Sequence, residues 1–247
     1  MFAIEYRLAV LILDITSLHY LAESWSLRVL RLALYRNRSG NRVSDKNGFR
    51  KTEPLISISE SDRIDLLCGT TTKTLSRGEL VDFTQLTFVT GAAFMTFKGT
   101  NLMNNFNGKK IGVVKGTTTH AALKELLDDP EIKAEIALLN SMAEGLAAME
   151  KGKIDAISAD QVVLIGLALK SGRPENFTIL PSLISYEPFA LAVRRNDADF
   201  RLEADRVISH LYRSKKIMQI YNKWFGQFSI QMPTALEAMI QMNAIAE

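Results

Sequence analysis

Two clusters of small hydroxyl residues, each directly after an apolar run, are the parts of this sequence best suited to bind an anion. The first is Gly69–Thr74, followed by Arg77, and the second is Lys115–Thr119. Threonine hydroxyls and the N–H groups of a helix start donate to anions, and glycine lets the backbone approach them closely. An arginine can clamp a carboxylate through two parallel hydrogen bonds. These residue types predict two sites for anionic groups.

A third junction carries the opposite charge. Asp160 ends the apolar run 154–159, and its carboxylate is suited to an ammonium group. Taken alone, each junction is better explained by threonine helix caps and a solvated Arg77. Two sites for anions and one for a cation together fit a zwitterionic ligand better.

Motifs for catalysis and metal binding are missing from the sequence. The three histidines, His19, His120 and His210, lack the spacing of a zinc site, and there is no G-x-S-x-G, G-x-G-x-x-G or Walker lysine loop. The single cysteine, Cys68, excludes an intrachain disulfide, and its place at the end of an apolar run is typical of an inert buried thiol. We therefore expect no catalytic residue, no metal and no cofactor.

Composition narrows the class of protein further. The chain of 247 residues is 47% hydrophobic and 23% charged, which is ordinary for a globular protein and excludes a disordered one. Its longest apolar run, Leu8–Leu13, is far shorter than the roughly 20 residues of a membrane span. A net charge of +3 is too balanced to indicate nucleic acid as the partner.

The elements that must position these residues begin near Ile64. From there, short apolar runs alternate with amphipathic segments, which predicts an α/β fold with parallel strands. Predicted strands cover 64–69, 86–97 (one long strand or a pair), 109–116, 135–140, 154–160 and 188–195. Predicted helices cover 117–127 with a threonine cap, 141–152 ending at Gly152, 161–169, and two or three segments after Asp197, one of them ending at Gly226.

Several segments resemble one known family. DLLCGTTTKTLSRGELVDFTQLTFVTGAAF resembles the first-lobe signature of the polar amino-acid family of extracytoplasmic solute-binding proteins (bacterial family 3), the receptors of ABC importers. VVKGTTTHAAL, EGLAAMEKGKIDAISADQVVL, SYEPFALAVRR and IYNKWFG are similar to its later motifs, in the same order and spacing. The C-G-[ST]-T-T turn, with an arginine eight residues after its glycine, is most similar to the glutamate/aspartate-binding branch. The resemblance covers about residues 61–247.

The resemblance implies a two-lobed, hinged fold of the periplasmic-binding-protein type (type II), with a ligand cleft between the lobes. Residues 61–96 and 190–247 would form the first lobe and residues 97–189 the second, with crossings near Phe97 and Pro188. Residues 1–60 would be an atypical segment, and the first lobe is expected to be incomplete because too little patterned chain precedes Ile64.

The family motifs also imply roles for particular residues. Arg77, with Thr70 and Thr72, would bind the α-carboxylate of an amino acid, and Asp160 its α-ammonium. Thr117 and Thr118 would hold further ligand oxygens and help to close the cleft. Further candidates are Gly69 in the first turn, and Lys115 and Tyr186 for the ligand's side-chain end, Tyr186 being equally explained by packing.

The first sixty residues depart from the family pattern. Arg7, the run Leu8–Leu13 and Asp14 make a poor export signal, and an amphipathic helix or a translated segment foreign to the protein are the alternatives. The segment 28–40, RVLRLALYRNRSG, resembles a remnant of the opening strand, in which case Arg36 would meet a ligand side-chain carboxylate. The resemblance nevertheless implies a periplasmic location.

The function implied is that of a monomeric receptor without cofactor, metal or nucleic acid, and not that of an enzyme. It would bind a polar, acidic amino acid of the glutamate/aspartate kind and present it to the membrane permease of an ABC importer. Two alternatives stay open. One is a truncated member of the family that no longer binds ligand. The other is a dehydratase-type enzyme of the same fold, which would need an acid in addition to Asp160, and Glu187 is the only candidate near the expected cleft.

Overall fold

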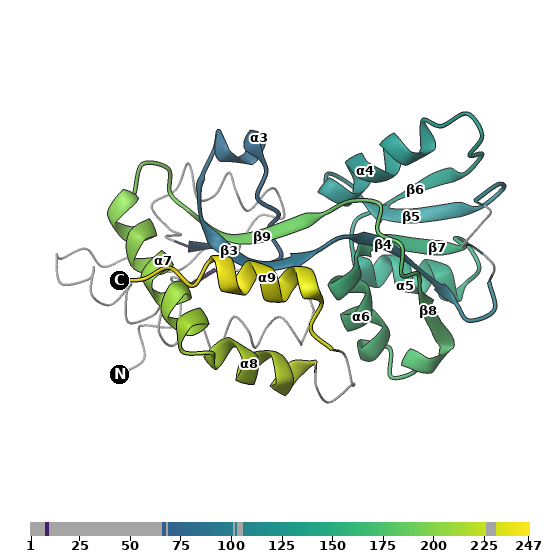
Figure 1. The fold of residues 1–247 in the computed structure, drawn as a ribbon. Coiled ribbons are helices and arrows are strands. Elements are labelled where there is room, and N and C mark those ends of the chain that lie inside the picture. Colours follow the sequence, from purple (N-terminus) through teal and green to yellow (C-terminus); the bar gives the residue numbers. More distant parts are fainter. Residues whose placement is uncertain (1–7, 10–65, 68, 101, 103–105, 226–230) are drawn as a thin grey trace, which may run out of the picture. The chain divides into compact units, whose positions relative to one another are not determined.

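The computed structural model describes residues 8–9, 66–67, 69–100, 102, 106–225 and 231–247. They form two compact units (Figure 1). Unit 1 combines the described residues up to Val89 with Pro188–Glu247, and unit 2 is Thr90–Glu187. The chain therefore crosses from one unit to the other at residues 89–90 and 187–188.

Unit 2 is built on a five-stranded mixed sheet with the order β6-β5-β7-β4-β8. Strand β5 pairs in parallel with β6 and β7, while β4 is antiparallel to β7 and β8. The strands are β4 (Ala92–Phe97), β5 (Lys110–Val114), β6 (Glu135–Leu139), β7 (Ala156–Asp160) and β8 (Phe177–Ile179). All of β4 belongs to this sheet, so the first crossing comes before the position near Phe97 that the sequence suggested.

Three helices cover the sheet of unit 2. They are α4 (Thr118–Leu127) on one face, and α5 (Met142–Glu150) and α6 (Gln161–Lys170) on the other (Figure 1). A short 3-10 helix, η2 (Pro174–Asn176), precedes β8. Because both faces are covered, the central strands are mainly apolar, as strands buried on both faces usually are. One cluster of buried side chains joins them to α4: Phe94, Leu102, Ile111, Val113, Leu123, Ala156 and Leu180.

The helix boundaries of unit 2 follow from local sequence. The hydroxyl of Thr117 accepts a hydrogen bond from the His120 N–H at the start of α4, and Ser141 does the same for Glu144 at α5. Gly152 follows α5 with a φ of 64°, a left-handed conformation that favours glycine. The predicted threonine cap of α4 and the end of α5 at Gly152 are both confirmed.

Unit 1 contains a sheet with the order β1-β2-β9-β3 among the described residues. Its strands are β1 (Leu8–Ala9), β2 (Leu66–Leu67), β3 (Asp82–Thr90) and β9 (Glu187–Val193). Strand β2 is parallel to β1 and antiparallel to β9. Its core cluster contains Leu67, Val81, Phe83, Ala190 and Ala192.

Helices α7 (Ala198–Arg213), α8 (Lys216–Trp224) and α9 (Thr234–Met242) complete unit 1 (Figure 1). Lys215, with a φ of 54°, separates α7 from α8. The Tyr212 hydroxyl donates to the carbonyl of Leu86 over 2.8 Å, which ties α7 to β3, and burial raises the pKa of this phenol. None of the helices in the described part of the chain is both long and apolar enough to cross a membrane.

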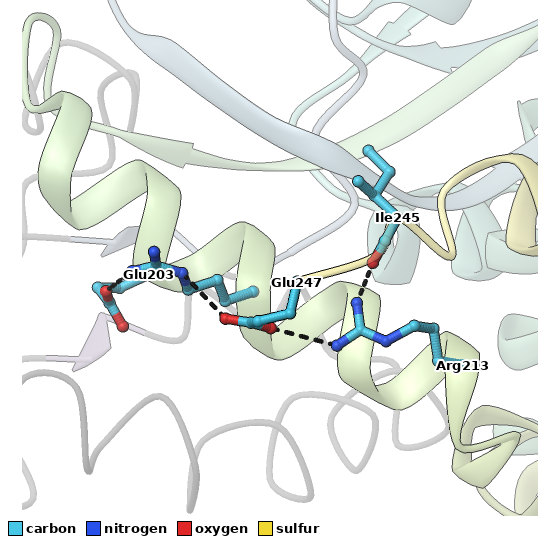
Figure 2. A network of polar contacts seen from close by, with 5 residues as sticks. Glu203, Arg213, Ile245 and Glu247 are labelled. Atoms are coloured by element: carbon cyan, nitrogen blue, oxygen red, sulfur yellow. Dashed lines mark hydrogen bonds and ion pairs between the residues drawn. The ribbon is translucent and has the colours of Figure 1, made fainter.

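The C-terminal residues are held against α7 by two arginines (Figure 2). Arg213 donates to the carbonyl of Ile245, and its guanidinium lies 3.3 Å from the carboxylate of Glu247. Arg206 bridges Glu203 and Glu247. Exposed ion pairs of this kind each contribute little, so their combined effect is to orient the tail rather than to hold the unit together.

Most predicted positions in the N-terminal segment lie outside the described residues. These include the segment 28–40 with Arg36 and the histidine His19. Cys68 and the predicted helix stop at Gly226, further along the chain, also lie outside the described residues. The exception is Leu8–Ala9, from the apolar run considered as an export signal, which pairs with Leu66–Leu67 in the sheet of unit 1.

Candidate ligand-binding site

The first hydroxyl cluster lies beside β9 in unit 1. Thr72 forms an antiparallel bridge with Phe189, and two backbone hydrogen bonds flank it, from Lys73 N–H to the Pro188 carbonyl (2.8 Å) and from Ala190 N–H to the Thr71 carbonyl (3.1 Å). The segment thus extends the sheet by main-chain contacts. As a result Thr72 is buried, with 4% of its surface exposed, while Gly69 and Thr70 are half-buried.

Arg77 is positioned by a short helix that the sequence patterns did not predict. Helix α3 (Leu75–Gly78) starts at Thr74, whose hydroxyl accepts from the Arg77 N–H at 3.2 Å. The half-buried Arg77 side chain turns back, and its Nη1 donates to the Thr72 carbonyl at 2.8 Å. The structure therefore brings Arg77 and Thr72 together, and this bond orients the guanidinium fork, which has five N–H donors in all. Thr74, a residue type favoured at the N-cap, is the local signal that marks the start of α3 in the sequence.

The second hydroxyl cluster lies at the start of α4 in unit 2. The Thr117 hydroxyl donates to the Val114 carbonyl at 2.8 Å and accepts from His120 N–H at 3.1 Å. Gly116 adopts a φ of 79°, and its N–H points to Nδ1 of His120 at 3.4 Å. Both hydrogen-bonding roles of the Thr117 hydroxyl thus serve the helix start, as the capping interpretation expects.

Thr118 points to a buried carboxylate. Its hydroxyl donates to Oε2 of Glu187 at 2.8 Å, and the hydroxyl of Ser185 donates to Oε1 of the same residue at 2.8 Å. Glu187 is only 2% exposed. Sequence reasoning considered Glu187 only as an acid for an enzyme and did not consider Ser185. The signal that could have found them is the S-x-E spacing at the start of β9, the strand that returns to unit 1.

Asp160 lies at the end of β7, where α6 begins. Its Oδ1 is fully buried, and the residue pairs in register with Ala92 of β4. The next N–H, of Gln161, donates to the Gly91 carbonyl at 2.8 Å. Strands β5 and β7 are parallel neighbours, so their carboxyl ends, which lead to Thr118 and Asp160, lie at the same edge of the sheet.

Gly91 allows a close backbone approach at this edge. A Cβ on Gly91 would lie 2.2 Å from the Ser185 carbonyl oxygen and 2.7 Å from Cδ1 of Leu183. The Ala92 N–H donates to the Ser185 hydroxyl at 3.3 Å. The segment that carries Glu187 is therefore packed directly on the start of β4.

Two further residues predicted for the site, Lys115 and Tyr186, have exposed side chains. Lys115 is exposed after β5, and Tyr186 is 78% exposed, which does not support packing as the role of its ring. Arg77, Thr70, Thr72 and Gly69 belong to unit 1, whereas Thr117, Thr118, Asp160, Lys115 and Tyr186 belong to unit 2. Among the described residues no group of three or more His, Cys, Asp and Glu side chains could hold a metal ion.

The amino-acid sequence is similar to the same family of proteins that its motifs resemble. Residues 49–227, more than half of the chain, match the model of the bacterial extracellular solute-binding proteins, family 3. An L-glutamate/L-aspartate-binding protein of Pseudomonas aeruginosa is 28% identical over 174 residues, which are 70% of this chain and 58% of that protein. A glutamate/aspartate import solute-binding protein of Salmonella typhimurium is 28% identical over 181 residues, 69% of this chain and 60% of the relative. The chain thus matches somewhat over half the length of each relative.

Solved structures agree on the fold. An ancestral arginine-binding protein bound to glutamine superposes with a TM-score of 0.61 at 24% identity, covering 81% of this chain and 87% of the other. The α/β architecture of the type II solute-binding fold is thereby confirmed. The resemblance to the glutamate/aspartate branch is confirmed separately, by the two relatives named for glutamate and aspartate. The chain belongs to the bacterial extracellular solute-binding proteins, family 3.

Proposed function

We propose that this protein is the amino-acid receptor of an ABC importer and binds a polar amino acid of the glutamate/aspartate kind. The observation that carries the proposal is a pair of oppositely charged, partly buried groups, each positioned by backbone contacts. The guanidinium of Arg77 is oriented by the Thr72 carbonyl in unit 1, and the carboxylate of Asp160 has a buried oxygen at the start of α6 in unit 2. One cation and one anion suit the two charges of an α-amino acid.

In this proposal Arg77, with Thr70 and Thr72, binds the α-carboxylate, and Asp160 binds the α-ammonium. Gly69 lies at the same turn as Thr70, and Lys115 or Tyr186 would contact the ligand side chain. The capping bonds of Thr117 reduce what its hydroxyl can offer a ligand, so we assign it to the helix start. Selectivity for an acidic side chain rests on the two relatives named for glutamate and aspartate.

Family membership supports the location and the permease partner that we propose. We infer that the protein acts outside the cytoplasm as a monomer, without cofactor, and presents its ligand to a membrane permease. Binding of ligand would draw the two units together in the hinged motion expected of such receptors. An enzyme is less favoured, because both oxygens of Glu187, the acid proposed for it, already accept hydroxyl hydrogen bonds.

Calorimetric titration of the purified chain tests this function. The ligands are L-glutamate, L-aspartate, L-glutamine and L-arginine, and we expect tight binding of an acidic one. Tight binding of glutamine or arginine in its place would retain the receptor function but contradict the acidic selectivity. No heat with any of the four, from a sample that unfolds cooperatively, would favour the truncated, non-binding alternative.

A further inference from the structure

The turn that leads into β5 contains the dipeptide Asn107–Gly108, and both of its residues are exposed to water. The Lys109 N–H donates to the Phe106 carbonyl at 3.0 Å, which closes a β-turn over the dipeptide. Gly108 has a φ of 70°, as type II turns require at their third position. An asparagine directly before a glycine is also the arrangement in which an asparagine side chain reacts most readily with its own backbone, because glycine places no side chain in the way.

That reaction is deamidation, and its second reactant is water. The Gly108 nitrogen loses its proton and attacks Cγ of Asn107. The new Cγ–N bond closes a five-membered succinimide ring, the bond from Cγ to Nδ2 breaks, and Nδ2 leaves as ammonia with the proton. Water then adds to one of the two ring carbonyls. Attack at Cγ gives aspartate, and attack at the main-chain carbonyl gives isoaspartate.

In the folded chain the backbone of Lys133 binds both reacting groups. Its N–H donates to Oδ1 of Asn107 at 2.7 Å, and its carbonyl accepts from the Gly108 N–H at 2.7 Å. The proton that must leave is therefore covered by a carbonyl oxygen, and the amide that must be attacked is held by its own oxygen. Attack on Cγ thus requires that this turn opens first, as exposed turns do from time to time.

The same two bonds continue the pairing of β5 with β6. The Glu135 N–H donates to the Lys109 carbonyl at 2.8 Å, and the parallel register begins at Lys110 and Glu135. The Asn107 side chain thus takes the place of a main-chain carbonyl at this end of the ladder. Conversion to aspartate would keep an acceptor for the Lys133 N–H, whereas isoaspartate lengthens the main chain by one carbon atom and would disrupt the turn.

We propose that Asn107 is a site of spontaneous deamidation which the backbone of Lys133 keeps unreactive while the turn before β5 is closed. Modification at this position then records how often the turn opens, and its isoaspartate product weakens the pairing of β5 with β6. The inference does not depend on the proposed function, because no ligand takes part in it.

The test follows deamidation in the folded chain and in the same chain unfolded in guanidinium chloride, at one pH and temperature. Mass spectrometry of the peptide 99–109 detects the replacement of NH2 by OH and the isoaspartyl product. We expect Asn107 to react at least about 10-fold more slowly in the folded chain, the factor to which two ordinary hydrogen bonds correspond. Asn101, Asn104 and Asn105 precede larger residues in the same peptide and are the internal controls.

Two substitutions separate the backbone of Lys133 from its exposed side chain. Lys133→Pro removes the N–H that binds Asn107 and should bring the rate in the folded chain towards that in the unfolded chain. Lys133→Ala is the matched control, because it keeps both backbone groups, and it should react at the wild-type rate. If Lys133→Pro does not fold, hydrogen exchange of the Gly108 amide, measured by NMR in the wild type, replaces it. Exchange and deamidation both require the open turn, so folding should slow them by the same factor.

Each part of the inference has a result that would overturn it. Equal rates in the folded and unfolded chains would refute protection by the fold. A rate at Asn107 no higher than at the three control asparagines in the unfolded chain would refute the site itself. A wild-type rate in folded Lys133→Pro, or different factors for exchange and deamidation, would refute the part played by Lys133.

Discussion

Arg77 is the single residue on which the proposed binding of an amino acid depends most. Its guanidinium is half-buried, and one N–H group is held by the Thr72 carbonyl. A side chain oriented in this way loses less freedom when it binds a carboxylate than a solvated arginine does. The same contact explains why its removal should affect binding more than folding.

We expect Arg77→Ala to weaken amino-acid binding at least about 100-fold, the equivalent of two charge-assisted hydrogen bonds. The melting temperature should change little, because the Arg77 side chain is only half-buried and its bond to the Thr72 carbonyl stays within one local segment. Calorimetry and thermal unfolding measure the two effects. Arg173→Ala is the matched control, because Arg173 is an exposed arginine whose salt bridge is with Glu150, outside the proposed site. Unchanged affinity in Arg77→Ala would refute the carboxylate assignment.

A second single residue, Asp205, leads to a prediction of how the stability of the protein depends on pH. Burial raises the pKa of this carboxyl, against the opposing effects of the Gln85 N–H, Arg201 and Lys73. The folded protein therefore binds this proton more tightly than the unfolded chain does, so this group lowers stability as pH rises above the ordinary range of Asp. Asp205→Asn keeps an acceptor for Gln85 and removes the charge.

The expected result is that Asp205→Asn raises stability at neutral pH and shows a smaller loss of stability between acidic and neutral pH than the wild type. Urea unfolding at a series of pH values measures both quantities. A variant less stable than the wild type at neutral pH would mean that attraction to Arg201 and Lys73 outweighs the burial of the charge.

At the scale of elements, the start of β4 is a junction where two backbone segments of unit 2 approach closely. Gly91 approaches the backbone of Ser185, and a backbone oxygen cannot rotate away as a side chain can. Any side chain at residue 91 must displace the segment that carries Ser185 and Glu187. The same segment holds Thr118, so packing and the proposed site share one support.

Gly91→Ala should therefore destabilise the protein by about 1–3 kcal/mol, as other overpacking substitutions do. Chemical unfolding with and without ligand measures this change and any loss of affinity that comes with it. Gly78→Ala is the control, because nothing lies within 4 Å of a Cβ on Gly78. Equal stability of the two variants would contradict the close approach at residue 91.

At the scale of the whole molecule, the two units are each compact and are joined by two chain crossings. Each unit has its own buried cluster, around Phe94 and Ile111 in unit 2 and around Phe83 and Ala192 in unit 1. Two cores joined by crossings are compatible with the hinged closure proposed above. A ligand bound only by the folded chain must also stabilise it.

Amino acid at about 100 times its dissociation constant should stabilise the protein by about 2.7 kcal/mol. For a chain of this size that corresponds to a rise in melting temperature of roughly 5–10 °C. Small-angle X-ray scattering of the same samples should show a smaller radius of gyration with ligand. Arg77→Ala serves as the control and should show neither change. Stabilisation without compaction would retain binding but contradict hinge closure.

The sequence alone predicted the local features well. Its apolar runs located β5, β6, β7 and β9 to within a few residues, and its polar junctions located the cap of α4. These features depend on residues a few positions apart, so they can be predicted from a single amino-acid sequence. Helix α3 and strand β8 were missed because each is no longer than four residues and lacks a period.

The class of fold, the family motifs and the residue types at the three junctions could be predicted from the amino-acid sequence, because they depend on local pattern. The place of β4 in the sheet of unit 2, and the hydrogen bond from Thr118 to Glu187, 69 positions away, came from the folded structure. Hydrogen-bond direction and sheet membership depend on partners that meet only after the chain has folded. No periodicity along the chain encodes which of two hydroxyl residues caps a helix and which faces a buried carboxylate.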